Sequence, residues 1–114
     1  MYKTELALET LEKEKNSKEL LPITIKDERN LLSFPEEISK EYAAIRAKKI
    51  LEQFSKGAEI EVFDLGRSKK AFLLPIEEQS ERWLKVNYLC YSVENSDKHG
   101  CCPASKINVI KKKD

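Results

Sequence analysis

Four short segments in the second half of the chain alternate between apolar and polar residues or are rich in β-branched and aromatic side chains. They cover residues 58–63, 71–76, 83–89 and 105–110. Such alternation is typical of strands with one buried face, and starts spaced roughly 10 to 20 residues apart indicate an antiparallel meander rather than strand–helix–strand units. The pattern predicts one small antiparallel sheet that curls into a barrel.

Apolar residues recur at helical spacing in the segment before these strands. The segment runs through residues 35–55 and stops before Gly57. Ser33 followed by Glu36 predicts a capping box, with Pro35 in the first turn. We expect this helix to pack on the sheet. Its predicted packing residues are Ile38, Tyr42, Ile45 and Phe54.

Two further segments precede this helix. Residues 4–17 are rich in Leu, Glu and Lys and predict a second helix, whose thin apolar stripe ends at Leu11. This helix is expected to be either solvated or docked on a partner or a second copy. Residues 20–32 predict a connector that begins like an edge strand. The connector is expected to lay four residues over the core, namely Ile23, Ile25, Leu31 and Leu32.

The length of the chain limits it to one modest core, because 114 residues cannot bury two. We therefore predict an α+β protein in which N-terminal helices precede a small antiparallel SH3-like barrel. A helical region, residues 1–57, would pack on the barrel, residues 58–114, as one folding unit. The 21 basic and 20 acidic residues nearly cancel, so no overall field draws the chain to nucleic acid or to a membrane.

The N-terminal residues contain no apolar stretch of signal-peptide length, and no run in the chain is long enough to cross a bilayer. We therefore expect a cytoplasmic protein, or a nuclear one if the source is a eukaryote. The three cysteines are an odd number in a chain without a secretion signal. They argue against a disulfide framework, and reduced thiols are expected.

The strand segments carry short motifs in a fixed order. Residues 57–64 open the series, residues 71–76 and 83–88 follow, and residues 102–107 close it with a Pro-Ala-Ser turn. This order resembles that of Tudor-like and chromo-barrel domains, in which a G-x-x-V-x-V strand, an A-x-V strand, a W-x-V-x-Y strand and a P-x-S-x-I turn follow one another. The resemblance implies a five-stranded SH3-like barrel that binds peptides, often with methylated lysine or arginine, or sometimes nucleic acid.

Aromatic residues are the first candidates for contacts with a partner. A methyl-lysine cage needs about three rings around one cation, and the loop at residues 65–68 supplies none. Trp83 alternates with Leu84 and Val86, so it points outward when they point inward; otherwise the helix at residues 35–55 covers it. Aromatic residues on strands also serve as core. The candidate partner-binding residues are Trp83, Tyr91, Phe63, Phe72 and Tyr88.

Basic residues gather at two places in spite of the balanced total. They are Arg67, Lys69 and Lys70 on one turn, and Lys106, Lys111, Lys112 and Lys113 in the last strand and the tail. These side chains either neutralise phosphates of RNA or DNA without reading bases, or form a solvated turn and a solubilising tail. Nucleic-acid binding is therefore the alternative to a protein partner.

Cys90, His99, Cys101 and Cys102 have the chemistry of zinc ligands. However, adjacent cysteines rarely bind one ion together, and no C-x-x-C pair is present. A thiol nucleophile with His99 as its base needs a third, orienting group, for which Asp97 is the only nearby residue. The sequence therefore predicts no metal, no cofactor and no catalytic residue. It predicts a small non-catalytic module that binds a protein or peptide.

Overall fold

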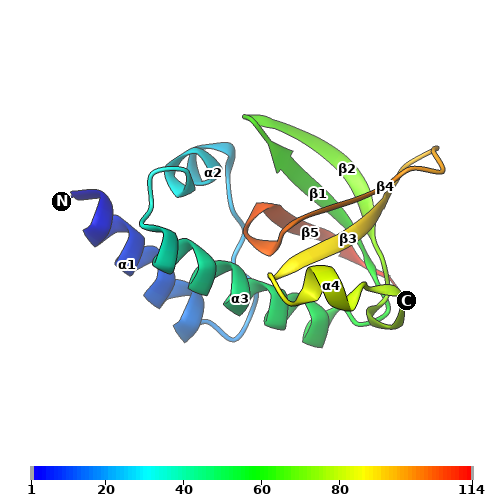
Figure 1. The fold of residues 1–114 in the computed structure, drawn as a ribbon, viewed down its shortest axis with the longest axis horizontal. Coiled ribbons are helices and arrows are strands. Elements are labelled where there is room, and N and C mark those ends of the chain that lie inside the picture. The colour runs from blue at the N-terminus through cyan, green and yellow to red at the C-terminus, as the bar shows by residue number, and fades with distance from the viewer. Residues whose placement is uncertain (1, 114) are drawn as a thin grey trace.

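Helices fill the first half of the chain and strands most of the second in the computed structural model, which describes residues 2–113 (Figure 1). The helices are α1 (Tyr2–Asn16), α2 (Ile25–Leu31), α3 (Glu36–Gln53) and α4 (Glu81–Leu84). The strands are β1 (Ala58–Asp64), β2 (Arg67–Leu73), β3 (Tyr88–Val93), β4 (His99–Pro103) and β5 (Ile107–Lys112). Two 3-10 turns are η1 (Ile76–Glu78) and η2 (Ala104–Lys106). The predicted α+β class is confirmed.

The strands form one antiparallel sheet in the order β4-β3-β2-β1-β5. β1 pairs with β2 on one side and with β5 on the other, where the register shifts between Glu59 and Ile60. The sheet curls but is not closed into a barrel, since β4 and β5 remain its two edges. The inner face that a barrel would enclose packs on α3 instead, which removes the apolar surface that would favour closure.

One predicted strand begins later than its alternation indicates. Residues 83 and 84 belong to α4, Asn87 then takes a left-handed conformation (φ 63°), and β3 begins only at Tyr88. Over about four residues, the apolar pattern of a single helical turn cannot be told apart from that of a short strand. The prediction that Trp83 lies on a strand was therefore wrong. The expected Pro-Ala-Ser turn is present as the 3-10 turn η2, which Pro103 caps, and β5 follows it at Ile107.

β4 lies outside the four segments that were predicted to be strands. Residues 94–98 turn the chain, with Asn95 left-handed (φ 57°) and the Val93 N–H donating to the Lys98 carbonyl oxygen at 3.0 Å. β4 then pairs with β3 from His99 to Pro103. β4 is only five residues long and contains Gly100 and Pro103, which are uncommon in strands, so its strand character is hidden in the sequence.

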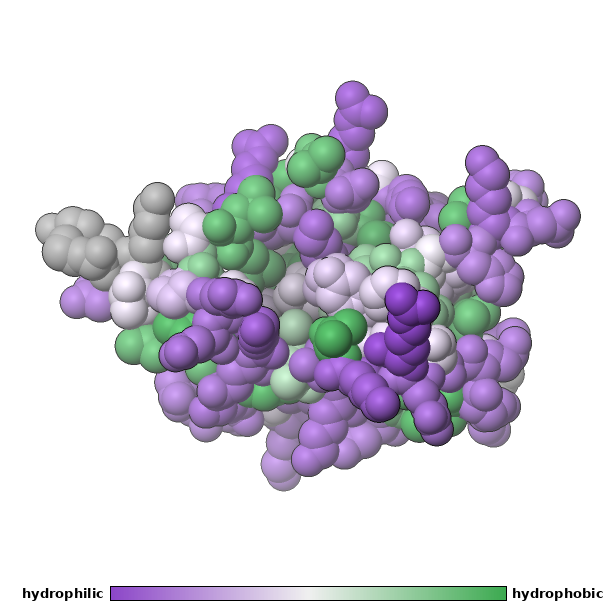
Figure 2. Space-filling view, in the orientation of Figure 1, coloured by the Kyte–Doolittle hydropathy of each residue, from purple (hydrophilic) through white to green (hydrophobic). Residues whose placement is uncertain are grey.

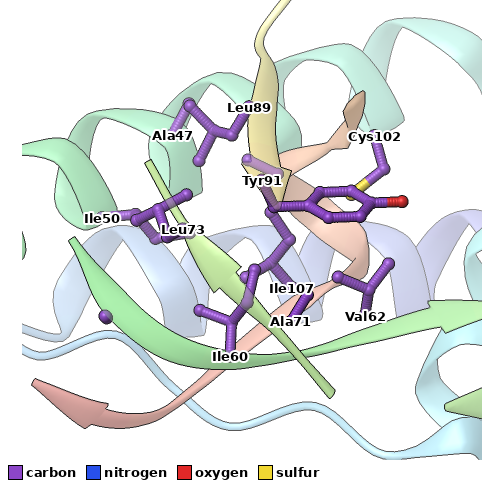
Figure 3. Packing of buried hydrophobic residues seen from close by; sticks show 12 residues of the cluster. Ala47, Ile50, Ile60, Val62, Ala71, Leu73, Leu89, Tyr91, Cys102 and Ile107 are labelled. Carbon is purple, nitrogen blue, oxygen red and sulfur yellow. The ribbon is translucent and has the colours of Figure 1, made fainter. Parts of the chain in front are cut away.

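The main core lies between α3 and the inner face of the sheet (Figure 3). Ala47 and Ile50 of α3 are buried in this cluster, and Phe54, which caps the C-terminus of α3, packs against it. The helix therefore packs on the sheet as predicted, although only Phe54 of the four predicted residues does so here. The strands contribute Ile60, Val62, Leu73, Leu89, Tyr91 and Ile107.

A second cluster forms where α3 extends beyond the sheet. Its α3 members are Ile38, Tyr42 and Ile45, which pack with Leu11 of α1, Ile23 of the connector and Phe63 of β1. An 18-residue helix is about 27 Å long, longer than five- to seven-residue strands, so its first turns meet other elements. The N-terminal half of α3 thus joins α1 and the connector to the sheet.

The predicted capping box at Ser33 is wrong. Pro35 caps α3 without a side-chain hydrogen bond, while the Ser33 hydroxyl donates to the Asn30 carbonyl oxygen at the end of α2. A capping box does occur at α2, where Thr24 Oγ1 accepts from the Asp27 N–H at 3.1 Å and Asp27 Oδ2 accepts from the Thr24 N–H at 2.8 Å. The hydroxyl of Ser33 had a nearer acceptor in the preceding helix.

α1 lies beside α3 of the same chain (Figure 1), an outcome that neither expectation for residues 4–17 included. Ala7, Leu11 and Glu14 are buried along one stripe of the helix. Glu14 extends this stripe beyond the last apolar residue, so a carboxylate occupies a position where an apolar side chain is usual. Its burial depends on partners from α3.

Arg46 of α3 is the main partner of Glu14, and both side chains are essentially inaccessible (0% and 1% exposed). Arg46 Nη1 donates to Glu14 Oε1 at 2.7 Å and to the Leu21 carbonyl oxygen at 2.6 Å, and Nη2 donates to the Ile107 carbonyl oxygen at 2.5 Å. Lys49 Nζ donates to Glu14 Oε2 at 2.8 Å. The guanidinium therefore ties α1, the connector and β5 to α3.

The connector covers the core with fewer residues than expected. Ile23 is buried, and the Asn108 side chain of β5 accepts from the Ile23 N–H at 2.7 Å and donates to its carbonyl oxygen at 2.6 Å. Leu31 packs on the second cluster. Leu32 is 70% exposed and Ile25 is also exposed, so these two do not cover the core.

Charged and polar side chains cover most of the face shown in Figure 2, where apolar atoms form small, separate patches. Within residues 2–113, none of the helices has the length and apolar character needed to cross a membrane.

Candidate binding surface on the sheet

Five side chains form one row across the outer face of the sheet, the face opposite the main core. The register pairs His99 with Ser92, Ser92 with Phe72, Phe72 with Glu59, and Glu59 with Lys111. Directly opposed residues on neighbouring strands have Cβ atoms about 5 Å apart and share a face. One residue from each strand thus lines up in the order His99, Ser92, Phe72, Glu59, Lys111, which we call the outer row.

A pocket of about 470 Å³ lies over four members of the outer row, from Ser92 to Lys111. Lys112 and Lys113 also line it. A volume of this size is within the range of small-ligand sites, and it is open rather than enclosed. The pocket therefore combines an aromatic ring, a hydroxyl, a carboxylate and three lysines.

Phe72 is the apolar centre of this pocket. Its side chain is 41% exposed although β2 is the middle strand of the sheet, with neighbours on both sides. A large apolar side chain left open in the middle of a sheet is more informative than one at an edge or a terminus, because a partner can cover it without disturbing the fold. Of the predicted aromatic residues, Phe72 lines this pocket together with the predicted basic residues Lys111, Lys112 and Lys113.

A second hollow of about 400 Å³ continues from the pocket towards the end of α3. It shares Lys112 and Lys113 with the pocket and adds Lys56 and Glu52. Both hollows therefore carry an excess of lysine together with one carboxylate each.

Two predicted partner-binding residues, Phe63 and Tyr91, lie in the cores, so the expectation that they face a partner does not agree with their burial. Phe63 is on the outer side of β1, but α1 and the connector cover it in the second cluster. Tyr91 points into the main core beside Cys102 and Val62 (Figure 3). Lys69 lies 5.3 Å from the centre of the Tyr91 ring. The alternation of residues along a strand shows on which face a side chain lies, but it does not show whether a helix distant in sequence covers that side chain.

Trp83 and Tyr88 pack on each other instead of facing a partner separately. Their ring centres are 5.4 Å apart with an angle of 24° between the planes, and the guanidinium of Arg82 lies 5.6 Å from the Trp83 ring. Trp83 remains 37% exposed on α4, not beneath α3. The ring faces used in this stack are closed to a cation, so these two residues do not form the open walls of a methyl-lysine cage.

The predicted basic residues lie at two ends of the β1–β2 ribbon. Arg67 pairs with Asp64 beside the turn, while Lys111 pairs with Glu59 near the other end of β1. Five residues along a strand separate the two places by about 17 Å. Lys69 and Lys70 are exposed near the turn, and Lys106 lies in η2. Lys111, Lys112 and Lys113 line the pocket over the exposed ring of Phe72, whereas Lys69 lies over the buried ring of Tyr91.

The cysteine cluster separates into two environments. Cys90 and Cys101 face each other across β3 and β4, with their sulfur atoms 2.7 Å apart. Cys102 points into the core, where burial raises its pKa to about 12, and His99 is exposed. Among the described residues, no group of three or more His, Cys, Asp or Glu side chains is arranged to hold a metal ion.

Comparison of the chain with protein-family models, with curated proteins and with solved structures returned no match. The function must therefore be inferred from the residues and geometry of this chain.

Proposed function

We propose that this protein is a small non-catalytic interaction module that binds an extended, acidic segment of a protein on the outer face of its sheet. The observation that carries the proposal is the outer row, in which Phe72 lies between Ser92 and Glu59 and in line with Lys111. A ring supplies a large contact area with little loss of rotamer freedom, and such residues dominate interface energies.

The lysines give the surface its preference for acidic partners. Lys111, Lys112 and Lys113 line the same pocket as the ring, and attraction between opposite charges speeds encounter more than it prolongs the complex. Glu59 lies between Phe72 and Lys111, where it would repel a continuous line of phosphates. A peptide with mixed charges suits such a surface better than a polyphosphate chain does.

We also propose that residues 58–112 have the topology of an SH3-like, Tudor-like barrel in an open form. Three features support this. The strands follow the order β4-β3-β2-β1-β5, a one-turn 3-10 helix separates β4 from β5, and β5 returns to β1. In this interpretation α3 covers the inner face of the sheet, which the other strands would cover in a closed barrel. The helical region, residues 1–57, and the sheet region, residues 58–114, then fold as one unit through the shared main core.

Single-stranded nucleic acid is the second candidate partner. Proteins that bind single strands combine aromatic rings, on which bases stack, with basic residues that neutralise phosphates. The proximity of Phe72 to Lys111, Lys112 and Lys113 fits that combination. Three phosphate contacts would weaken binding about twentyfold between about 50 mM and about 200 mM salt.

Selection from a displayed library of short random peptides, followed by fluorescence anisotropy, tests the proposal. We expect the selected peptides to be enriched in Asp and Glu, and Phe72→Ala to weaken their binding about thirtyfold. Ile110→Ala, which removes an exposed apolar side chain outside the pocket, is the matched control and should bind as the wild type does.

Charge reversal provides the second comparison. Replacing Lys111, Lys112 and Lys113 by Glu should slow association, whereas the same change at the exposed residues Lys18, Lys26 and Lys98 alters the net charge equally and should have a much smaller effect. Equal effects of the two triple variants, or unchanged binding by Phe72→Ala, would contradict the assigned surface. Binding of a single-stranded oligonucleotide with the steep salt dependence above, and of no peptide, would favour the second candidate.

A further inference from the structure

Cys90 and Cys101 form a pair that nothing in the proposed binding function uses. They are direct cross-strand partners in β3 and β4, and their sulfur atoms are 2.7 Å apart. Both are free thiols in this structure. Two thiols held this close on facing strands have the arrangement required for a covalent link, provided that the backbones are also at the right separation.

The hydrogen bonds around Cys90 show which kind of cross-strand pair it makes. The Cys90 N–H donates to Gln79 Oε1 at 2.7 Å, and its carbonyl oxygen accepts from Gln79 Nε2 at 3.0 Å and from the Leu74 N–H at 3.2 Å. Those partners lie on the β2 side, so the backbone groups of Cys90 are turned away from β4. Cys90 and Cys101 are therefore a non-hydrogen-bonded pair, for which Cα atoms are about 4.5 Å apart, within the range that disulfides span.

Exposure and position single out these two cysteines from the third. Cys101 is partly exposed on the edge strand β4, where no further strand covers it, whereas Cys90 is buried and held by Gln79. Cys102 is adjacent in sequence but points to the opposite face, into the main core. An oxidant in solution would therefore meet Cys101 first, and Cys90 would be the nearest thiol to resolve the product.

We propose that Cys90 and Cys101 are an oxidative modification site that closes to a cross-strand disulfide on reaction with a hydroperoxide. The sulfur of Cys101 attacks the peroxide, whose O–O bond breaks. Cys101 becomes a sulfenic acid, and the other oxygen leaves as water or alcohol. The sulfur of Cys90 then attacks the sulfenic sulfur, so that the S–S bond forms, the S–O bond breaks and water leaves. One hydroperoxide is reduced as two thiols are oxidised.

The reaction should be slow at neutral pH. Desolvation, together with the neighbouring Cys90 sulfur, raises the pKa of Cys101 to about 12, so little thiolate is present near pH 7. The thiolate fraction, and with it the initial rate, should rise about tenfold per pH unit below that value. The link should form without a large backbone movement and should fasten the edge strand β4 to β3.

Peptide mapping of the full chain, oxidised with hydrogen peroxide and digested without reductant, tests the proposal. The expected product links Cys90 to Cys101 and leaves Cys102 as a thiol, in the wild type and in Cys102→Ala alike. Cys90→Ser and Cys101→Ser should give no link, and an added dithiol should restore the free thiols. Because mapping of the wild type decides the outcome, the proposal does not depend on the variants folding.

Three results would overturn it: a disulfide between Cys101 and Cys102, a dimer joined through Cys101, or a sulfinic acid at Cys101 without any link. The melting temperature gives an independent measurement, since closing the loop between residues 90 and 101 should raise Tm by about 10 °C. A fall in Tm on linking would mean that the hairpin must distort to form the bond, and it would refute the assignment of a preformed pair.

Discussion

Replacement of Arg46 by Met should destabilise the protein more than any change to an ion pair on its surface. The guanidinium is inaccessible, and besides Glu14 it serves three carbonyl oxygens, those of Leu21, Ile107 and Ala104, the last at 3.3 Å from Nε. Met has a similar stem but no donors. The variant would therefore keep much of the packing and lose every one of these hydrogen bonds.

The magnitude follows from what remains buried. Removal of one partner of a buried ion pair costs about 3 to 5 kcal/mol, because the other charge stays behind without compensation. Here Lys49 still faces Glu14 at 2.8 Å, which lowers the cost, but three carbonyl groups lose a donor, at about 1 kcal/mol or more each. We expect a loss of about 5 kcal/mol, as large as the whole stability of the least stable domains, which is typically 5 to 15 kcal/mol.

Urea unfolding followed by circular dichroism measures this loss. The double variant Glu14→Leu with Arg46→Met removes both charges, so it should be more stable than Arg46→Met alone and show a coupling of about 2 kcal/mol. Lys13→Met, which breaks the exposed pair with Glu9, is the control and should change stability by less than about 0.5 kcal/mol. A loss below about 1 kcal/mol for Arg46→Met, or additive effects in the cycle, would refute the reasoning.

Three other predictions concern the sheet. Leu65→Asn should stabilise the fold by about 0.5 to 1 kcal/mol in urea unfolding, because exposed Leu65 (φ 51°) and Gly66 (φ 79°) form a two-residue hairpin turn that prefers Asn-Gly. Ile60→Ala should cost about 2 to 5 kcal/mol by leaving a cavity in the main core, where Ile60 is fully buried. Stability should fall between about pH 9 and about pH 12, since the unfolded chain releases the Cys102 proton that the folded chain keeps; Cys102→Ala should make this slope shallower by up to about 1 kcal/mol per pH unit. A destabilised Leu65→Asn, a loss under 1 kcal/mol for Ile60→Ala, or an unchanged alkaline slope would contradict the respective arguments.

The sequence by itself determined the elements whose pattern is long or strongly periodic. The helix at residues 35–55 was found within about two residues at each end, and β1 within one, because many residues there repeat one spacing. The position of helices in the N-terminal half and the antiparallel pairing of the strands also followed from local spacing. The short elements α4 and β4 could not be predicted in this way, because they are too short to show a helical or a strand repeat.

The candidate binding surface was found only in part. Phe72 and Lys111 to Lys113 were both named from the sequence, but as members of two separate hypotheses, one for a protein and one for nucleic acid. Glu59 of β1 pairs with Phe72 of β2 on one side and with Lys111 of β5 on the other, which brings the two residues together. The register of these strands cannot be predicted from the pattern of residues alone. Cys90 and Cys101 were likewise chosen for their chemistry, whereas their pairing depends on the β3–β4 register.

Tertiary structure alone decided which polar residues are inside. The sequence shows that a side chain is apolar or charged, and Glu14 lies past Leu11, the last apolar residue of a helix that was expected to be solvated or docked on a partner or a second copy. Glu14 is buried because Arg46 and Lys49 come to it from a helix some 30 residues away in sequence. In the same way, α1 covers Phe63 of β1, whereas Phe72 of the neighbouring strand β2 stays exposed on the same face. A charge can be buried only where distant partners compensate it, and the sequence does not record which distant residues meet.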